Sequence, residues 1–393
     1  MPSTRLYTPT FFLGFSYNFI LALHFTNNAM YPLFVRSEGG GIALVGLFMG
    51  MYSVGAVAGR PLVGYLIDRF GATRVLMLGS LCLSLPALGY VALLGQGFPL
   101  LVWPLRILQG FGYGAHFSAT FTLAAQIAPP DRRNEAIAMY GVSGLAGAIA
   151  GPPLGEWLIA SLGIAAFFYV MALIGVLATA VVSFVRLERK RAGFPTPREV
   201  IRALSTKEMR FVAVLAFLLA VAYSSPQSFL ATVAAERGLA QFSFYFAAWG
   251  AGGALIRFVG GSWGDKRGLR RVLLPSFGVY AAGLLLLSFA PSTPVLVAAG
   301  LFTGVAHGIA FPAVASLGYA MAPERFTGSA MALVTGMMDV GAAANALAIG
   351  ALAEGVGYWI VFPVAALAAA TAMALLWASI RLHPAPIRPR HES

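Results

Sequence analysis

Residues 64–74 read GYLIDRFGATR and decide the fold. This polar stretch lies between two long apolar runs, and its charged residues Asp68 and Arg74 cannot lie in hydrocarbon without partners. We therefore expect a tight loop at a membrane surface. Residues 261–271, GSWGDKRGLRR, repeat the pattern, with Asp265 in the place of Asp68. One loop used twice at equivalent places predicts a chain of two homologous halves.

The composition predicts a membrane protein. The chain has 393 residues, of which 59% are hydrophobic and 10% are charged, whereas soluble domains carry about 25% charged residues. Apolar runs of roughly 20 or more residues recur, and each can cross about 30 Å of hydrocarbon. In hydrocarbon the backbone N–H and C=O groups of such a run must find partners within a helix or a closed barrel. The runs are too long for barrel strands. We predict an all-α integral membrane protein.

Twelve spans are expected. They cover approximately residues 10–35, 42–66, 74–95, 100–127, 135–161, 164–185, 209–234, 239–262, 271–290, 294–321, 329–353 and 357–381. An even number places both termini on one side. If that side is the cytoplasm, Arg36 and Arg237 are the only basic residues in outer loops, and Arg106 is the only one deep in a span. Lys and Arg favour cytoplasmic loops. This distribution predicts a multi-pass protein of the cell (inner) membrane with cytoplasmic termini.

A polar linker divides the chain. We predict an N-terminal six-helix bundle at 1–185, a cytoplasmic linker at 186–208, and a C-terminal six-helix bundle with a short tail at 209–393. The net charge of +12 follows from the basic cytoplasmic loops, for which anionic lipid is a sufficient partner. Nucleic acid is therefore not expected as a partner.

Three motifs resemble those of the major facilitator superfamily of secondary transporters. The loop at 64–74 resembles the family signature between spans two and three. Residues 106–110, RILQG, resemble its motif in span four, and residues 147–155, GAIAGPPLG, resemble a span-five motif found mostly in exporters that run as antiporters. The family usually has a further glycine where this chain has Glu156. The resemblance implies two pseudo-symmetric bundles that work by alternating access, as in twelve-span drug/proton antiporter-like exporters.

The resemblance also implies a conformational gate. The aspartate of each charged loop would latch one half to a helix start in the other: Asp68 to span eleven near 327–331, and Asp265 to span five near 134–137. Latches of this kind hold one access state and break in the other. The predicted gate residues are Arg60, Gly64, Asp68, Arg69, Gly71, Arg74, Arg257, Asp265, Gly268 and Arg271.

Ionisable residues within spans predict proton coupling. Asp339 is the deepest carboxylate, and a buried carboxyl can take up a proton at one face and release it at the other. Arg106 needs a counter-charge, an anionic substrate group or a satisfied structural partner. For His307 a hydrogen-bonded core position is the alternative. The predicted coupling residues are Asp339, Arg106, His307 and Glu156.

Polar side chains at helical spacing predict the substrate cavity, with interhelical packing as their alternative role. The predicted cavity residues are His24, Asn27, Asn28, Gln109, Tyr113, His116, Tyr223, Gln227 and Thr335. Pro226 suggests that span seven bends. Glycines spaced four apart allow close helix approach, and the predicted packing motif is Gly147, Gly151, Pro152 and Gly155.

These features predict a secondary transporter and not an enzyme. We expect proton-coupled efflux of a small organic molecule. One alternative is proton-coupled uptake of a small organic anion, and another is a membrane receptor that binds a ligand without moving it. The expected partners are a small-molecule substrate, protons and the lipid bilayer, and the chain is expected to be a monomer without cofactor or metal.

Overall fold

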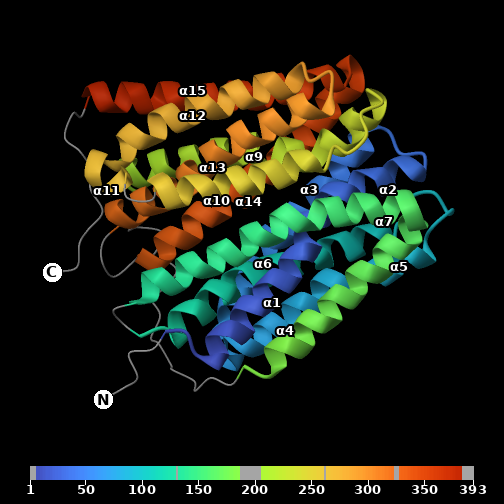
Figure 1. Ribbon diagram of the computed structural model, residues 1–393, viewed down its shortest axis with the longest axis horizontal. Helices are drawn as coiled ribbons and strands as arrows, with labels where there is room; N and C mark the ends of the chain where they lie inside the picture. Colours follow the sequence, from blue (N-terminus) through green and yellow to red (C-terminus); the bar gives the residue numbers. More distant parts are fainter. Residues whose placement is uncertain (1–5, 130–131, 186–204, 261–262, 323–326, 383–393) are drawn as a thin grey trace. The chain divides into compact units, whose positions relative to one another are not determined.

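The computed structural model describes residues 6–129, 132–185, 205–260, 263–322 and 327–382. These residues form helices joined by short turns (Figure 1). The chain divides into two compact units, Met1–Ala192 and Gly193–Ser393, and the division falls inside the predicted linker. The all-α prediction is confirmed.

Helices of the N-terminal unit follow the predicted spans. In order they are α1 (Pro9–Phe25), η1 (Thr26–Met30), α2 (Tyr31–Ser37), α3 (Ile42–Phe70), α4 (Ala72–Ser84), α5 (Pro86–Ala92), α6 (Val102–Ile127) and α7 (Arg133–Ser183). The first predicted span is thus divided by the 3₁₀ turn η1. Two predicted spans form α7, which breaks at Gly163, where φ is 83°. Glycine adopts this backbone conformation without the steric penalty of other residues.

The C-terminal unit follows the second half of the prediction. Its elements are α9 (Lys207–Glu236), α10 (Phe244–Gly260), α11 (Trp263–Arg267), α12 (Leu269–Ser288), α13 (Thr293–Met321), α14 (Thr327–Val356), η4 (Tyr358–Ile360) and α15 (Val361–Leu382). Within the described residues, eight helices are long and apolar enough to cross a membrane. The count of twelve spans stays a prediction.

The stretch at 64–74 corrects one expectation. We predicted a loop, but α3 continues to Phe70 and α4 begins at Ala72. The direction of the chain changes at Gly71 alone, where φ is 86°. Gly268 before α12 repeats this turn with φ at 87°. The charged residues therefore lie mostly on helix ends, and glycine at each turn has a conformational reason.

Packing within the two units repeats as the sequence does. In the N-terminal unit α6 packs on α3 and α4, and in the C-terminal unit α13 packs on α10 and α12. A Cβ at Gly110 would strike the carbonyl oxygen of Tyr52, and a Cβ at Gly304 would strike that of Trp249. Equivalent glycines thus bring equivalent helix backbones together, as expected of a duplicated bundle.

A carboxylate joins two loops of the N-terminal unit. Both oxygens of Glu38, after α2, accept hydrogen bonds from the backbone amide of Gly95 at 3.0 Å, and one also accepts from Gly97 at 3.1 Å. The C-terminal unit uses the opposite charge for the same purpose. Arg237, after α9, donates to the carbonyl of Ser288 at 2.8 Å at the end of α12, where a cation is favoured by the helix dipole.

Glu38→Gln should weaken this loop contact. Glutamine removes the charge that strengthens the hydrogen bonds and places an NH₂ group against amide donors. Because the loop is partly exposed, we expect a loss of about 1 kcal/mol, seen as a lower midpoint of thermal unfolding in detergent. Glu236→Gln, at an exposed acid, is the control. Equal midpoints for the two variants would contradict the assigned contact.

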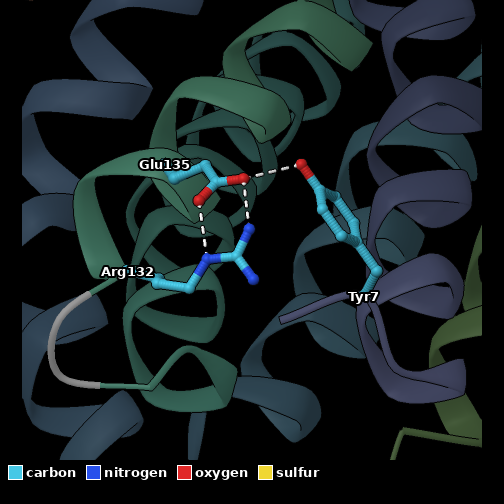
Figure 2. A network of polar contacts seen from close by, with 3 residues as sticks. All are labelled: Tyr7, Arg132 and Glu135. Carbon is cyan, nitrogen blue, oxygen red and sulfur yellow. Dashed lines mark hydrogen bonds and ion pairs between the residues drawn. The ribbon is translucent and has the colours of Figure 1, made fainter. Parts of the chain in front are cut away.

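Figure 2 shows a second polar cluster, at the start of α7. Glu135 accepts hydrogen bonds from Arg132 Nε at 2.8 Å and Nη2 at 2.7 Å, and from the Tyr7 hydroxyl at 2.8 Å. The bond to the carboxylate raises the pKa of the Tyr7 hydroxyl above its ordinary value. The cluster ties Tyr7, two residues before α1, to the first turn of α7. This helix start is also the predicted target of the Asp265 latch.

Candidate functional site

Arg106 on α6 lies at the centre of a polar cluster in the N-terminal unit. Its side chain is fully buried. Nε donates to the carbonyl of Phe48 at 3.0 Å, and Nη2 donates to Oδ1 of Asn28 at 2.7 Å. Nη1 donates to Oε1 of Gln109 at 3.0 Å. The predicted residues Arg106, Asn28 and Gln109 therefore lie together.

Three aromatic rings surround the guanidinium. Its central carbon lies 4.8 Å from the ring centroid of Tyr31, 4.3 Å from that of Phe48 and 4.7 Å from that of Tyr52. Each of these rings attracts a cation through its negative face. Within the described part of the chain, no carboxylate lies within ion-pair distance of Arg106. Rings and neutral oxygens stabilise its charge. Of the partners considered for Arg106, the described residues therefore supply structural ones and no counter-charge.

Gln109 extends the cluster toward α4 and α5. Its amide nitrogen donates to the Tyr31 hydroxyl at 2.8 Å and to the Leu83 carbonyl at 3.1 Å. Its oxygen accepts from the Tyr90 hydroxyl at 3.0 Å as well as from Arg106. All polar atoms of this amide therefore have partners, as a buried amide requires. Gln109 positions Arg106.

His24 and His116 lie beside this cluster. Nδ1 of His116 is 3.1 Å from the Tyr17 hydroxyl and 3.2 Å from Oγ1 of Thr120. The His116 ring lies 5.4 Å from the Phe25 ring, next to His24 in the chain. His24 is 2% exposed, yet neither of its ring nitrogens has a hydrogen-bond partner among the described residues. A buried polar group without a partner costs free energy, so His24 is a candidate for contact with water or substrate.

The span-five glycines pack α7 against α1 and η1. A Cβ at Gly147 would strike Ala22, and one at Gly155 would strike the side chain of Asn27. The amide of Asn27 donates to the carbonyls of Leu23 at 2.7 Å and Gly151 at 2.9 Å. Of the two roles weighed for Asn27, the structure displays the packing one. Pro152 lies in the same part of α7, within a continuous helix.

Gly155→Ala should destabilise the N-terminal unit. The added methyl group would overlap the Asn27 amide, and overpacking costs roughly 1–3 kcal/mol. Gly144→Ala is the matched control on the same helix, because its nearest neighbour, Nδ2 of Asn18, would lie at an ordinary 3.7 Å. Thermal unfolding should separate the two variants. If both unfolded at the wild-type midpoint, the close contact would be refuted.

His307 on α13 is surrounded by aromatic rings in the C-terminal unit. Ring centroids of Tyr223 and Trp249 lie 4.9 Å and 5.0 Å from that of His307. Phe311 follows at 5.8 Å, and the Tyr280 hydroxyl lies 3.5 Å from Nδ1. The predicted residues His307 and Tyr223 are therefore in contact. They come from α13 and α9, and α9 continues through Pro226 as one helix.

The remaining coupling and cavity candidates lie on α14, α7 and α9. Asp339 and Thr335 are half-buried one turn apart on α14, and Oγ1 of Thr335 donates to the carbonyl of Met331 at 2.9 Å. Glu156 is half-buried on α7, and Gln227 is half-buried on α9. Their predicted roles stay predictions.

The gate residues are only partly described. The side chains of Asp68 and Asp265 lie outside the described residues, as do those of both predicted latch targets at 134 and 327–329. Gly64 lies within α3. Among the basic residues, Arg60 and Arg257 are half-buried, and Arg69, Arg74 and Arg271 are exposed. The gate stays a prediction.

Several contributing residues were not predicted from the sequence. They are Tyr31, Phe48, Tyr52 and Tyr90 around Arg106, Trp249, Tyr280 and Phe311 around His307, and Glu38 in the loop contact. The usable signal was the buried arginine itself. A cation in an apolar helix needs either acids or rings nearby, and the neighbouring spans offered rings.

Comparisons with known proteins agree with this architecture. The family model of the Major Facilitator Superfamily matches residues 11–261 and 212–393. An uncharacterised MFS-type transporter of Salmonella typhimurium is 23% identical over 361 residues, covering 90% of this chain and 92% of that protein. Two crystal structures of nucleoside transporter NupG have TM-scores of 0.77 and 0.74, at 13% and 12% identity. They cover 94% and 95% of this chain and 99% of NupG, and this likeness concerns the fold.

Some relatives are named for drug resistance. A multidrug resistance protein B homolog of Mycobacterium tuberculosis is 32% identical over 152 residues, which are 39% of this chain and 28% of that protein. A multi-drug resistance efflux pump PmrA homolog of Lactococcus lactis is 26% identical over 229 residues, which are 56% of this chain and 54% of that protein. The family match covers residues 11–393, and the chain is therefore a multi-pass membrane transporter of the major facilitator superfamily.

Proposed function

We propose that the protein exports small, largely apolar organic compounds across the inner membrane in exchange for protons. The observation that carries this proposal is the packing of the span-five glycines. In this chain the motif that resembles antiporting exporters brings α7 into close contact with α1 at Gly147 and with η1 at Gly155, where an added Cβ is excluded. A relative named as a multi-drug resistance efflux pump and one named as a multidrug resistance protein support the same direction of transport.

In this proposal Asp339 carries the proton. It is the deepest carboxylate of the sequence and lies half-buried on α14. Arg106 holds a positive charge in the N-terminal unit, and His307 and Glu156 are further titratable groups. Asp68 and Asp265 act as cytoplasmic latches that hold one access state, with both termini on that side. The chain acts as a monomer.

The direction can be tested in everted membrane vesicles that respire and so acidify their lumen. We expect such vesicles to accumulate ethidium only when they contain the protein. Nigericin, which removes the pH gradient, should release the dye. Ethidium is a permanent cation, so the pH difference alone does not trap it. Accumulation that persisted after nigericin would contradict proton exchange.

A second candidate function is uptake of an organic anion together with protons. It is favoured by the buried charge of Arg106, which lacks a carboxylate partner in the described part of the chain, and by the unpartnered imidazole of His24. Everted vesicles preloaded with labelled 2-naphthalenesulfonate, which stays ionised in the acidic lumen, distinguish the two candidates. A symporter would release the anion faster when the gradient is applied, whereas the proposed exporter would not.

A further inference from the structure

A ladder of near-parallel rings runs through His307 in the C-terminal unit. The imidazole is inclined by 28° to the ring of Tyr223 and by 13° to that of Phe311. Both of these end rings are half-buried, whereas His307 is 8% exposed. Aromatic rings with centroids 4.5–7 Å apart attract one another when stacked with an offset. Parallel ring faces of this kind are a surface on which a further flat ring can stack.

The N-terminal unit contains an equivalent cluster with a different geometry. Sequence duplication places Tyr113 at the position of His307 and Phe117 at that of Phe311. The Tyr113 ring is 5.7 Å from Phe25 but inclined by 60°, and 5.9 Å from Phe117 but inclined by 41°. Since both units use equivalent glycines to pack the same helices, packing of the bundle does not require parallel rings. The parallel arrangement is a property of the second copy.

His307 also brings a polar atom to the ladder. Its Nδ1 faces the Tyr280 hydroxyl at 3.5 Å. No residue in the described part of the chain forms a hydrogen bond with Nε2. A neutral imidazole nitrogen with no protein partner can donate or accept a hydrogen bond, so Nε2 is open to a polar group of a ligand. The site therefore combines stacking surfaces with one unused hydrogen-bonding position.

We propose that Tyr223, His307 and Phe311 bind a planar aromatic ring, and that Nε2 of His307 forms a hydrogen bond with a polar group at the edge of that ring. The ligand class is a flat aromatic or heteroaromatic compound with a hydroxyl, amine or carbonyl substituent. That this ligand is the transported substrate rests on the proposed function. The binding site itself does not depend on the proposed function.

Binding can be measured without a gradient on the purified full-length protein in detergent. The ring centroids of Trp249 and His307 are 5.0 Å apart, so Trp249 fluorescence reports on this site. Its share of the emission is the difference between the wild type and a Trp249→Phe variant. We expect 2-naphthol to quench that emission saturably. Decahydro-2-naphthol has the same carbon skeleton without aromatic faces and should not bind measurably.

Variants separate the stacking from the hydrogen bond. His307→Ala should raise the apparent Kd for 2-naphthol about tenfold or more, because a stacking partner and a hydrogen bond are both lost. Phe302→Ala, at a half-exposed ring on the same helix, should change it less than about twofold. His307→Phe keeps the ring, and should bind naphthalene as the wild type does but lose the preference for 2-naphthol over naphthalene.

Two results would overturn the site: equal binding of 2-naphthol and its saturated analogue, or equal effects of His307→Ala and Phe302→Ala. A retained preference for 2-naphthol in His307→Phe would remove the hydrogen bond from the proposal. Failure of the proposed function gives a different pattern. Ring binding would then be intact in detergent while gradient-driven ethidium transport was absent.

Discussion

Asp339→Asn is expected to abolish transport driven by a pH gradient. Asparagine has nearly the same shape as aspartate but cannot take up and release a proton, so the coupled cycle has no carrier at this position. Exchange of substrate across the membrane without a gradient should persist, because that step needs no net proton movement. Both activities can be followed with ethidium in proteoliposomes. We expect a loss of gradient-driven accumulation by a factor of roughly 100 or more, which corresponds to about 2.7 kcal/mol.

Glu354→Gln provides the matched control for Asp339. Glu354 lies on the same helix, α14, but close to its end, where the side chain is exposed. The Glu354→Gln variant should transport ethidium as the wild type does. Full gradient-driven flux in Asp339→Asn would transfer the coupling role to His307 or Glu156. Equal losses in both variants would indicate a general effect of charge on α14.

Arg106→Leu should have the largest effect on stability. The change removes the donor that satisfies the Phe48 carbonyl, Asn28 Oδ1 and part of Gln109 Oε1, and it leaves three rings without their cation. Each unsatisfied buried acceptor costs about 1–3 kcal/mol. We expect a total loss of about 3 kcal/mol or more, with little folded protein recovered from the membrane.

Arg106→Lys tests the geometry of the same contacts. Lysine keeps the charge, but its single ammonium group cannot reach acceptors on three elements as the planar guanidinium does. It should fold better than the leucine variant and remain less stable than the wild type. Arg36→Leu, at an exposed arginine with one 3.4 Å hydrogen bond, is the control. A wild-type unfolding midpoint for Arg106→Leu would refute the assigned cluster.

The fold could be predicted because its causes are local or periodic. Long apolar runs must be helical in lipid, and the charged turn at Asp68 returns at Asp265. Gly71 was noticed as part of this pattern, but the pattern did not reveal that it alone forms the turn. Charged side chains at the membrane surface are compatible with either a loop or a helix end, so α3 was predicted to end too early.

The candidate site could be predicted only in part. A buried arginine is conspicuous in an apolar sequence, so Arg106 was found. The rings around it were not, because Tyr31, Tyr52 and Tyr90 come from separate helices and meet only after packing. For Asn27 the sequence left cavity lining and helix packing open, because both roles need an inward-facing amide. This amide joins η1 to α7 through the Gly151 carbonyl, and its role in the cavity stays a prediction.

Proton-coupled export is tested most directly with purified protein in proteoliposomes that have an acidic lumen and a membrane potential clamped at zero by potassium and valinomycin. Ethidium concentrations inside and outside are measured at steady state. We predict accumulation above the outside concentration, its collapse on addition of nigericin, and its absence in Asp339→Asn. Equal concentrations on both sides while ethidium still exchanges across the membrane would contradict it, because the protein would then be a facilitator without proton coupling.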